Sequence, residues 1–552
     1  MIQVVLWLPF AAGLLAAMSP RRATPWVAVV GAGAALAIGI GLLASFDSEA
    51  TGLQHPVDES WIPELGVRYS LGIDGLNIFL SLLTSVSWFA VTLWSTIREP
   101  DRPKTWFVMM GLAHTATLGA FLSQDLLLFV LFFDLMLIPF FFMFSGWGSE
   151  HPGRDWEQTV KPGPATIKMV VYTLVGSLLM LAGAIATGVI AGDGGTPVFS
   201  MSALAADPLG EGSQRWIFCF FALAFLVKMP AFLVHGWMAD AYRTAPLPAL
   251  ALFSAVLSKV GAYGFLKVVL PIFPAATIQF QEVLLVVAVA SILYGSIMAF
   301  TQTSARLVVG YSSIAQLGFI TLGIFALRPD GADGAILQMV NHGLVTVPLM
   351  LLFVILVERV GSDDINRMGG LALRAPVMAA LFLIVTMALL AIPGSSNFVG
   401  EFFILNGAFQ AKTAFAIVAS LGVAMAAYYA LRLYQHAMHN RKRDSIESRE
   451  IGWREGAVVG ALVACIVALA FYPNLIVERT DTTVDQQLRS FEEPSGQTAA
   501  SPATPSGASA SPTPASQPAG PGREAEEPAA GLSDGEAVLQ GVGPPTIEVA
   551  PE

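Results

Sequence analysis

Five ionisable side chains lie inside long apolar runs of the chain, where a charge is costly. They are Asp134, Lys228, Lys259, His342 and Glu401. A charged group at the middle of a bilayer costs about 3 kcal/mol or more unless it faces protein or water, so such residues are usually functional. Carboxylates, amines and imidazoles all bind and release protons. The residue types therefore predict a proton path through the apolar part of the protein.

Each of these side chains also has a purely structural interpretation. Asp134 and Lys228 could form a static ion pair, since charges about 4 Å apart attract by about 4 kcal/mol at an effective dielectric constant of about 20. His342 could be an ordinary buried histidine that is satisfied by hydrogen bonds. Lys259 is too central in its apolar run to reach water by extending along the helix. We favour the proton path, because the structural interpretation leaves too many buried charges unexplained.

Prolines interrupt two of the apolar runs that carry these groups. Pro230 follows Lys228 by two residues, and Pro393-Gly394 precedes Glu401 by eight. Proline has no N–H and its ring clashes with the carbonyl one turn back, so each run is predicted to be a broken helix. Broken membrane helices with an ionisable group near the break are a common way to build ion sites in transporters.

The composition requires a membrane around these helices. The chain has 552 residues, of which 55% are hydrophobic and only 12% charged, and its mean hydropathy is +0.66. Apolar runs of at least about 18 residues, long enough to span a bilayer, recur throughout. We predict an all-α polytopic membrane protein with about fourteen transmembrane helices. The expected spans are 2–18, 24–45, 71–96, 104–122, 126–147, 164–190, 214–238, 246–270, 277–299, 304–327, 334–358, 376–407, 413–439 and 453–473.

The spans group into a predicted domain order. Residues 1–103 hold three helices and an acidic outer loop, and 441–473 hold the last helix. The broken seventh and twelfth spans are five spans apart, which predicts two inverted five-helix repeats at 104–271 and 272–440. Residues 474–552 are predicted to form an acidic, disordered tail rich in Pro, Ala and Ser.

Charges in the loops predict the orientation. Seventeen Lys and Arg residues fall in one set of alternate loops and three in the other. The basic set is expected on the cytoplasmic side, so that both termini lie on the outer side. The segment after Asn474 carries −9 of the total formal charge of −11, which leaves a nearly neutral membrane body and no basic patch for nucleic acid.

Several kinds of chemistry have no signature in this sequence. There is no phosphate-binding loop, no dinucleotide fingerprint and no cysteine cluster for iron–sulfur ligation. The two cysteines, Cys219 and Cys465, are predicted to be small buried hydrophobic residues. Other polar residues in the spans are weaker candidates that could simply pack, extend to the membrane surface or shape a helix end. These are His114, His235, Lys168, Arg306, Tyr311 and Gln316.

Motifs in the third to thirteenth spans resemble those of a known family, the antiporter-like membrane subunits of respiratory complex I. The motifs are Ser70-Leu-Gly-Ile-Asp-Gly-Leu-Asn77, Lys168-Met-Val-Val-Tyr-Thr-Leu-Val-Gly-Ser177, Val227-Lys-Met-Pro230, His235-Gly-Trp237, Ser258-Lys-Val-Gly-Ala-Tyr-Gly264, Tyr311-Ser-Ser-Ile-Ala-Gln-Leu-Gly-Phe319, His342-Gly-Leu344 and Pro393-Gly-Ser-Ser-Asn-Phe-Val-Gly-Glu-Phe402. Each is modest alone, but together and in this order they are highly specific.

The resemblance implies a proton-translocating subunit of NADH–quinone oxidoreductase in a bacterial inner membrane. It implies that Asp134 works with Lys228, and that Lys259, His342 and Glu401 form a central polar axis toward the outer side. Redox chemistry would take place in partner subunits that hold FMN and Fe–S clusters, with no cofactor in this chain. The neighbours would be the L-type and N-type antiporter-like subunits within the same lipid bilayer.

Two positions refine the resemblance. Relatives of the L and N types, and the related Mrp antiporter subunits, usually carry lysine where this chain has Glu401, so the glutamate favours the M type. The family usually has glutamate where this chain has Asp134, whose arm is one methylene shorter. Either the helices lie closer together there, or a water bridges Asp134 and Lys228. The alternative functions are a subunit of an Mrp-type sodium–proton antiporter and a spacer that conducts nothing.

Overall fold

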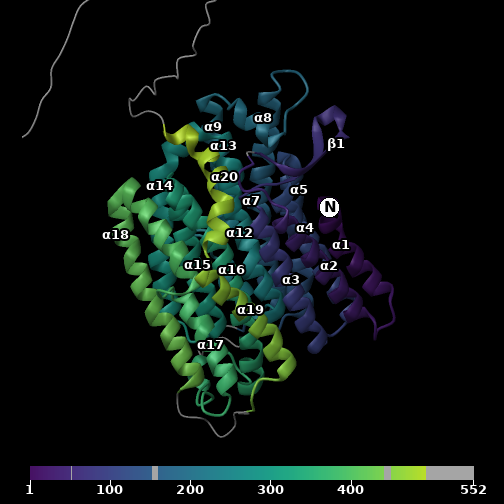
Figure 1. Ribbon diagram of the computed structural model, residues 1–552, viewed down its shortest axis with the longest axis vertical. Helices are drawn as coiled ribbons and strands as arrows, with labels where there is room; N and C mark the ends of the chain where they lie inside the picture. Colours follow the sequence, from purple (N-terminus) through teal and green to yellow (C-terminus); the bar gives the residue numbers. More distant parts are fainter. Residues whose placement is uncertain (51, 152–158, 440–448, 493–552) are drawn as a thin grey trace, which may run out of the picture. The chain divides into compact units, whose positions relative to one another are not determined.

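The structure is a computed structural model that describes residues 1–50, 52–151, 159–439 and 449–492. Within these ranges, 11 helices are long and apolar enough to cross a membrane. Most of the helices run side by side along the vertical direction of Figure 1. The prediction of a mostly helical, polytopic membrane protein is therefore confirmed in its general form.

The N-terminal region contains three helices and a small sheet. The helices are α1 (Ile2–Met18), α2 (Thr24–Ala44) and α3 (Ile78–Ile97). Between α2 and α3, the strands β1 (Gln54–Ile62) and β2 (Val67–Ile73) form an antiparallel hairpin. The all-α prediction is corrected at this point, because the segment expected to be only an acidic outer loop is a β-hairpin.

Local chemistry explains why this acidic segment forms a hairpin. Arg68 donates hydrogen bonds of 2.7 and 2.8 Å to the two carboxylate oxygens of Asp58 on the facing strand. Hydrogen bonding to Arg68 lowers the pKa of Asp58. The connecting turn contains the short helix η1 (Pro63–Leu65) and then Gly66, whose φ of 69° lies in the left-handed region that favours glycine.

The helices that follow carry the first two candidate residues. They are α4 (Pro103–Leu122), α5 (Leu126–Leu135), α6 (Leu137–Trp147), α7 (Pro162–Ala191), α8 (Met201–Ala206), α9 (Glu211–Lys228) and α10 (Met238–Thr244). The fifth expected span is interrupted between α5 and α6. Pro139 is four residues after Leu135, so it provides no N–H to that carbonyl and its ring crowds it. The interruption, at Met136, lies two residues after Asp134.

The eighth expected span is irregular and completely enclosed by protein. It consists of α11 (Leu247–Leu252), η2 (Phe253–Leu257), α12 (Ser258–Gly264), η3 (Phe265–Val269) and α13 (Leu270–Ile272). Both η2 and η3 have π-helical hydrogen bonding. Such segments insert an extra residue into a turn and are frequent at functional sites. They flank the short helix that carries Lys259.

The remaining helices are longer and include the second predicted break. They are α14 (Pro274–Thr301), α15 (Ala305–Phe325), α16 (Pro329–Val360), η4 (Ile365–Arg367), α17 (Pro376–Leu389) and α18 (Ser396–Met438). The break predicted around Pro393 lies between α17 and α18. Lys412 has non-helical backbone angles (φ −147°, ψ 79°), so α18 consists of two helices that meet at a kink. The kink falls between the twelfth and thirteenth expected spans.

The end of the described chain corrects the prediction of a disordered tail. After α19 (Trp453–Phe471), residues Asn474–Glu492 form the helix α20. Its apolar side chains Ile476, Val484 and Leu488 are spaced by multiples of four residues and are almost completely buried. This spacing places them on one helical face, which packs against the body. The rest of the predicted tail, 493–552, lies outside the described residues.

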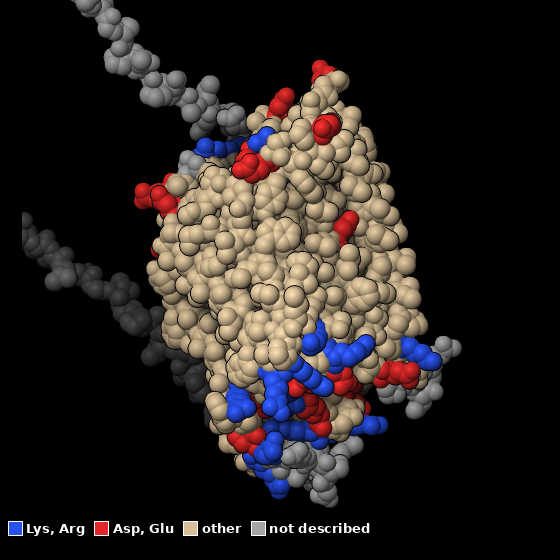
Figure 2. Space-filling view, turned by 90° about the vertical axis from the view of Figure 1, so that its right-hand side faces the viewer, with Lys and Arg blue, Asp and Glu red and all other residues tan. Residues whose placement is uncertain are grey.

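Burial separates the central helices from those that face the surroundings. The apolar windows of α11–α13 and of α15 are 100% buried, and that of α16 is 89% buried, whereas those of α2 and α19 are only 33% and 28% buried. Figure 2 shows a broad band almost without charged residues, with Lys and Arg gathered at its lower end. The helices that carry Lys259 and His342 therefore lie in the protein interior at the level of this band.

Candidate functional site

Lys228 is the last residue of α9, next to the predicted helix break. The following residues leave the helix because Pro230 cannot continue it. The Lys228 side chain is buried, with 6% of its surface exposed. Its Nζ donates a hydrogen bond of 3.1 Å to the Phe133 carbonyl and lies 4.2 Å from the centre of the Phe133 ring. The amine is thus held at the end of α5.

Asp134 is close to this amine but does not pair with it directly. It is half-buried on α5, lies beside Ser177 and is within electrostatic range of Lys228. No ion pair joins Asp134 and Lys228, both of which belong to the described ranges. Instead, Lys228 donates to the backbone of the preceding residue, Phe133. A direct ion pair between Asp134 and Lys228 is therefore not formed, and the amine is held by the backbone of α5 instead.

Lys259 is buried completely and directly contacts another of the five ionisable candidates. Its Nζ lies 2.8 Å from Nδ1 of His342. It also donates to the Ser254 carbonyl at 2.9 Å and contacts the Ser258 hydroxyl at 3.3 Å. The π-helical segment η2 positions this group, because it precedes Ser258 and shifts the register of α12. Two residues that are 83 positions apart in the chain are therefore in hydrogen-bond contact.

The contact with Lys259 determines which ring nitrogen of His342 carries the proton. An ammonium group can only donate, so Nδ1 of His342 accepts when Lys259 is charged, and the neutral ring then carries its proton on Nε2. Nε2 is buried and has no hydrogen-bond partner among the described residues. The ring therefore accepts on one side and presents a proton on the other, which is the arrangement that a proton relay needs.

Glu401 lies on the second turn of α18, behind the helix break. Its Oε1 accepts hydrogen bonds from Nε2 of Gln316 at 2.8 Å and, more weakly, from Nε2 of Gln338 at 3.4 Å. The two glutamines also bond to each other at 2.6 Å. Glu401 is 3% exposed, and its Oε2 has no partner in the described part of the chain. One carboxylate oxygen is thus held while the other is open to a further group.

Several buried polar side chains of α16 and α18 are close in sequence to His342 and Glu401. Asn341 and Gln338 lie within one helical turn of His342 on α16, and Asn341 donates to the Ser396 carbonyl at 2.8 Å. The amide of Asn397 is buried as well. Oxygens of Gln338, Asn341 and Asn397 have no hydrogen-bond partner within the described ranges. Helices α16 and α18 therefore enclose a polar region inside an otherwise apolar body.

The close approach of α16 and α18 depends on two glycines. A Cβ on Gly400 would lie 2.6 Å from Oε1 of Gln338, and a Cβ on Gly334 would lie 2.5 Å from the backbone nitrogen of Ile404. Larger residues at either position would force the helices apart. The absence of side chains there brings Glu401 against the same helix that carries His342.

The structure thus brings the five predicted residues together in three groups. Asp134 and Lys228 form the first group, Lys259 and His342 the second, and Glu401 with its two glutamines the third. Hydrogen bonds between described side chains do not connect the first group to the second. Packing does connect them, since a Cβ on Gly261 of α12 would lie 2.8 Å from the Phe225 carbonyl of α9.

The weaker candidates have different surroundings. His114 is buried and stacks on a tryptophan ring, and Nε2 of His235 lies 2.9 Å from a tyrosine hydroxyl. Lys168 forms a partly exposed ion pair of 2.8 Å with Asp240. Arg306 donates to a backbone carbonyl at 2.6 Å, and Tyr311 is buried beside another tyrosine. These contacts hold helices and helix ends in place.

Two polar residues have a larger role in the structure than the sequence indicated. Gln316 was expected to shape a helix boundary, but it is the main hydrogen-bond donor to Glu401. Lys267 forms a buried ion pair of 2.6 Å with Asp74, two turns beyond Lys259. The signal for both was present, since an uncharged amide or an amine within an apolar helix also needs a partner.

The cysteines and acids provide no metal centre in the described part of the chain. No group of three or more His, Cys, Asp or Glu residues that could hold a metal ion occurs there. The prediction that both cysteines are buried is wrong, because Cys219 and Cys465 are exposed on the surface of the body. Both lie on helices of the apolar band, where the surroundings are lipid or neighbouring protein, so exposure there is compatible with an apolar side chain.

A known protein family matches the part of the chain that contains the broken helices and the buried ionisable residues. Residues 123–426 match the family described as NADH:quinone oxidoreductase/Mrp antiporter, TM. The match covers more than half of the chain and includes all five predicted residues. The chain belongs to this family of ion-translocating membrane proteins.

Individual relatives narrow the comparison. NADH-quinone oxidoreductase subunit M of Rhodobacter capsulatus is 33% identical over 508 residues, which cover 89% of this chain and 97% of the relative. The subunit M of Escherichia coli K12 is 31% identical over 491 residues, with 86% and 95% coverage. Both relatives match over nearly their whole length.

Chains of solved membrane complexes have a similar fold. A chain of respiratory complex I from Thermus thermophilus has a TM-score of 0.80 and 30% identity, and the match covers 88% of this chain and all of that one. A chain of the Mrp complex from Dietzia has a TM-score of 0.75 at 20% identity, with 88% and 97% coverage. The second likeness shows a shared fold only.

Proposed function

We propose that this chain is the M-type antiporter-like subunit of an NADH–quinone oxidoreductase and that it carries protons across the membrane. The observation that supports this most strongly is the buried contact of 2.8 Å between Lys259 and His342, followed by polar side chains that lead to Glu401. Ionisable groups at membrane depth that face the protein interior are typical of proton relays. Electron transfer in partner subunits supplies the free energy.

The proposed path has a direction. Protons enter near Asp134 and Lys228 from the basic end of the body, which we assign to the cytoplasm. They pass Lys259 and His342 and leave past Glu401 to the outer side. Figure 2 supports this assignment, because Lys and Arg gather at one end of the uncharged band. Both termini then lie outside a bacterial inner membrane.

The path also requires water at two places. One is the apolar contact between α9 and α12, which separates Lys228 from Lys259. The other is the polar region between Nε2 of His342 and Oε2 of Glu401, where both atoms lack a partner among the described residues. Buried polar atoms are nearly always hydrogen-bonded, and a buried water typically makes about three such bonds. We assign water molecules to the second place. At the first place α9 and α12 pack closely, so they must separate before water can link Lys228 to Lys259.

Two inverted repeats of five helices provide the framework for this path. We infer that they cover 104–271 and 272–440, within an arrangement of fourteen membrane crossings. The two breaks support this interpretation, since α9 ends at Lys228 and α17 ends at Leu389, shortly before Pro230 and Pro393 respectively. Breaks at matching positions of two repeats commonly mark the ion site of a transporter.

The assembly supplies what this chain does not. FMN and Fe–S clusters in partner subunits would oxidise NADH and pass electrons to quinone, and no redox step is assigned to residues of this chain. L-type and N-type antiporter-like subunits would be its neighbours in the membrane. This division of labour is supported by the relatives named subunit M and by the likeness to a chain of complex I.

One experiment separates this proposal from its rival, an Mrp-type sodium–proton antiporter. The complex that contains this chain is purified from native membranes and examined for flavin, Fe–S absorption and NADH–quinone activity. All three are expected. If they are absent and the complex exchanges sodium for protons, the rival is correct. If Asp134→Ala, Lys228→Ala and Glu401→Ala each assemble and pump fully, the proposed path is wrong.

The glutamine that holds Glu401 offers a graded test. Gln316→Leu removes its 2.8 Å hydrogen bond to Glu401, and a bond to a charged group contributes about 1.5–3 kcal/mol. We expect NADH-driven proton pumping to slow by roughly tenfold, because about 1.4 kcal/mol corresponds to a factor of ten. Gln281→Leu is the control, since Gln281 bonds to the Phe325 carbonyl at 2.9 Å. Equal pumping by both variants would show that Gln316 does not act on the path.

A further inference from the structure

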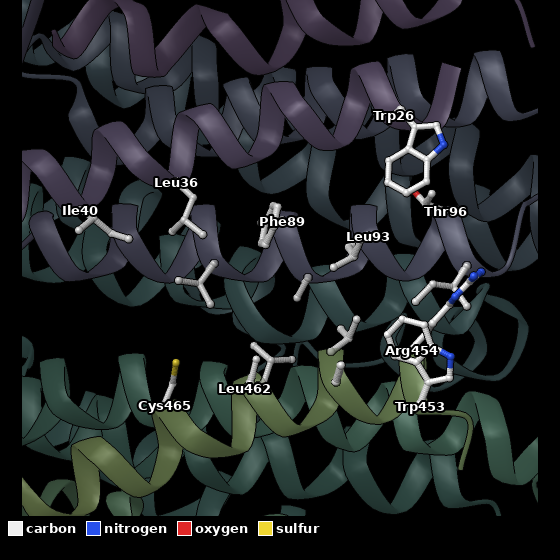
Figure 3. Close-up of a pocket in the computed structure, with 16 residues that line it drawn as sticks. Trp26, Leu36, Ile40, Phe89, Leu93, Thr96, Trp453, Arg454, Leu462 and Cys465 are labelled. Carbon is white, nitrogen blue, oxygen red and sulfur yellow. The ribbon is translucent and has the colours of Figure 1, made fainter. Parts of the chain in front are cut away.

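An apolar groove lies on the surface of the body, away from the proposed proton path. It is lined by α2, α3 and α19 and has a volume of about 640 Å³, which is within the range of about 300–1,000 Å³ for small-molecule sites. Figure 3 shows its lining residues, which are almost all aliphatic or aromatic. Only one end is polar, where Thr96 and Arg454 lie near Trp26 and Trp453.

The length of the groove matches one leaflet of a bilayer. It extends along α19 from Trp453 to Cys465 (Figure 3). These residues are twelve positions apart, or about 18 Å at about 1.5 Å per residue. Half of a hydrocarbon core that is about 30 Å thick is about 15 Å. Tryptophans are enriched at the boundary between lipid tails and headgroups, so Trp26 and Trp453 mark the headgroup end.

The cation at that end has no carboxylate partner within the described ranges. Arg454 is exposed and forms no ion pair there, and its guanidinium lies 5.4 Å from the centre of the Trp453 ring. The neighbouring acids Glu358 and Glu455 both bind Arg98 instead. A guanidinium group binds phosphate through parallel hydrogen bonds. The end of the groove is therefore complementary to a phosphate group.

We propose that this groove binds one glycerophospholipid molecule, with an acyl chain along α19 and the phosphate at Arg454. A helix of a partner subunit would be the other apolar occupant. Such a helix crosses both leaflets, whereas the groove extends over about one, and a helix has no need of a single cation at one end. The groove thus has the length, the polarity and the charge of a phospholipid site on the basic side of the membrane.

A photoactivatable lipid tests this site in the native complex. Membranes or purified complex are loaded with phosphatidylglycerol that carries a diazirine near the end of one acyl chain. After illumination, labelled peptides are identified by mass spectrometry. We expect label on α19 around Cys465, because the end of the chain lies there. Diacylglycerol with the same chains lacks the phosphate and should label this peptide roughly tenfold less.

Matched variants separate a site from general lipid contact. Ala461 lines the groove and is exposed, whereas Ala464 is exposed on the same helix but does not line it. Ala461→Phe should abolish the label and Ala464→Phe should preserve it. Arg454→Gln, an exposed change that leaves the core intact, should weaken labelling roughly tenfold, and Arg22→Gln is its control.

Three results would overturn the proposal. The first is equal labelling by phosphatidylglycerol and diacylglycerol, which would exclude a phosphate contact. The second is equal labelling of the Arg454→Gln and Arg22→Gln complexes, which would exclude a role for this cation. The third is cross-linking of the α19 peptide to another polypeptide in place of lipid, which would show that a partner subunit fills the groove.

Discussion

Lys259→Met stops proton transfer through this subunit while the complex still assembles. Methionine has a similar length but binds no proton, so His342 loses the group that contacts its Nδ1 at 2.8 Å. Positioned proton donors and acceptors typically contribute about 10²–10⁴-fold to a rate, so we expect the flux through this path to fall at least about a hundredfold. The measurement is NADH-driven acidification of vesicles that contain the reconstituted complex.

The control for this variant is a lysine outside the row. Lys412 lies at the kink of α18 and forms an exposed ion pair of 2.8 Å with Glu282, and exposed pairs contribute only about 0–1 kcal/mol. Lys412→Met should pump like the unmodified complex. Undiminished pumping by an assembled Lys259→Met complex would remove Lys259 from the path.

Glu401→Gln is expected to reduce proton pumping as much as Lys259→Met does, but by removing a proton acceptor on the outer side. Glutamine nearly preserves the shape of the side chain and can still bond to Gln316 and Gln338, so the packing of α18 on α16 is maintained. The amide cannot take up and release a proton, however. Protons that reach His342 then have no acceptor on the outer side, and pumping is lost with little change in stability.

Two further substitutions show whether the carboxylate itself matters. Glu401→Asp retains the acid on a shorter arm and should retain part of the activity. Glu282→Gln removes an exposed acid, and this control should pump normally. If Glu401→Gln pumps as well as Glu282→Gln, protons leave this subunit by another route, for which the buried pair of Lys267 and Asp74 would be the first candidate.

The buried ionisable residues and the helix breaks could be predicted because their signals are local. A charge in a long apolar run is conspicuous in one dimension, and so is a proline two residues after Lys228. The same logic correctly placed the end of α9 and the interval between α17 and α18. The direct contact between Lys259 and His342 depends on how α12 packs on α16, which no local pattern reports.

Other features were missed because a stronger local signal hid them. The acidic composition after Asn474 suggested disorder, although the spacing of Ile476, Val484 and Leu488 is that of a helix with one buried face. Thr480 lies on this face and donates a 3.0 Å hydrogen bond to Asp333. The β-hairpin before α3 was missed for the same reason, because its acidic residues suggested a loop. The ion pair between Asp58 and Arg68 that joins its strands cannot be recognised from the sequence.

The glutamines around Glu401 could not be predicted as part of the site for a different reason. Gln316 and Gln338 carry no charge, so a search for ionisable residues passes over them. Burial makes them significant, because an amide in an apolar interior must find a hydrogen-bond partner. Their position beside a carboxylate follows from the close approach of α16 and α18 at Gly334 and Gly400. That approach is a property of the packed helices.

Combining the two variants tests most directly whether Lys259, His342 and Glu401 belong to one proton path. The quantity to measure is the number of protons pumped per NADH oxidised by the reconstituted complex with Lys259→Met, Glu401→Gln or both. Groups that act in series fail together, so the double variant should pump as much as either single variant. If the two losses add, Lys259 and Glu401 serve separate routes and the single path is contradicted.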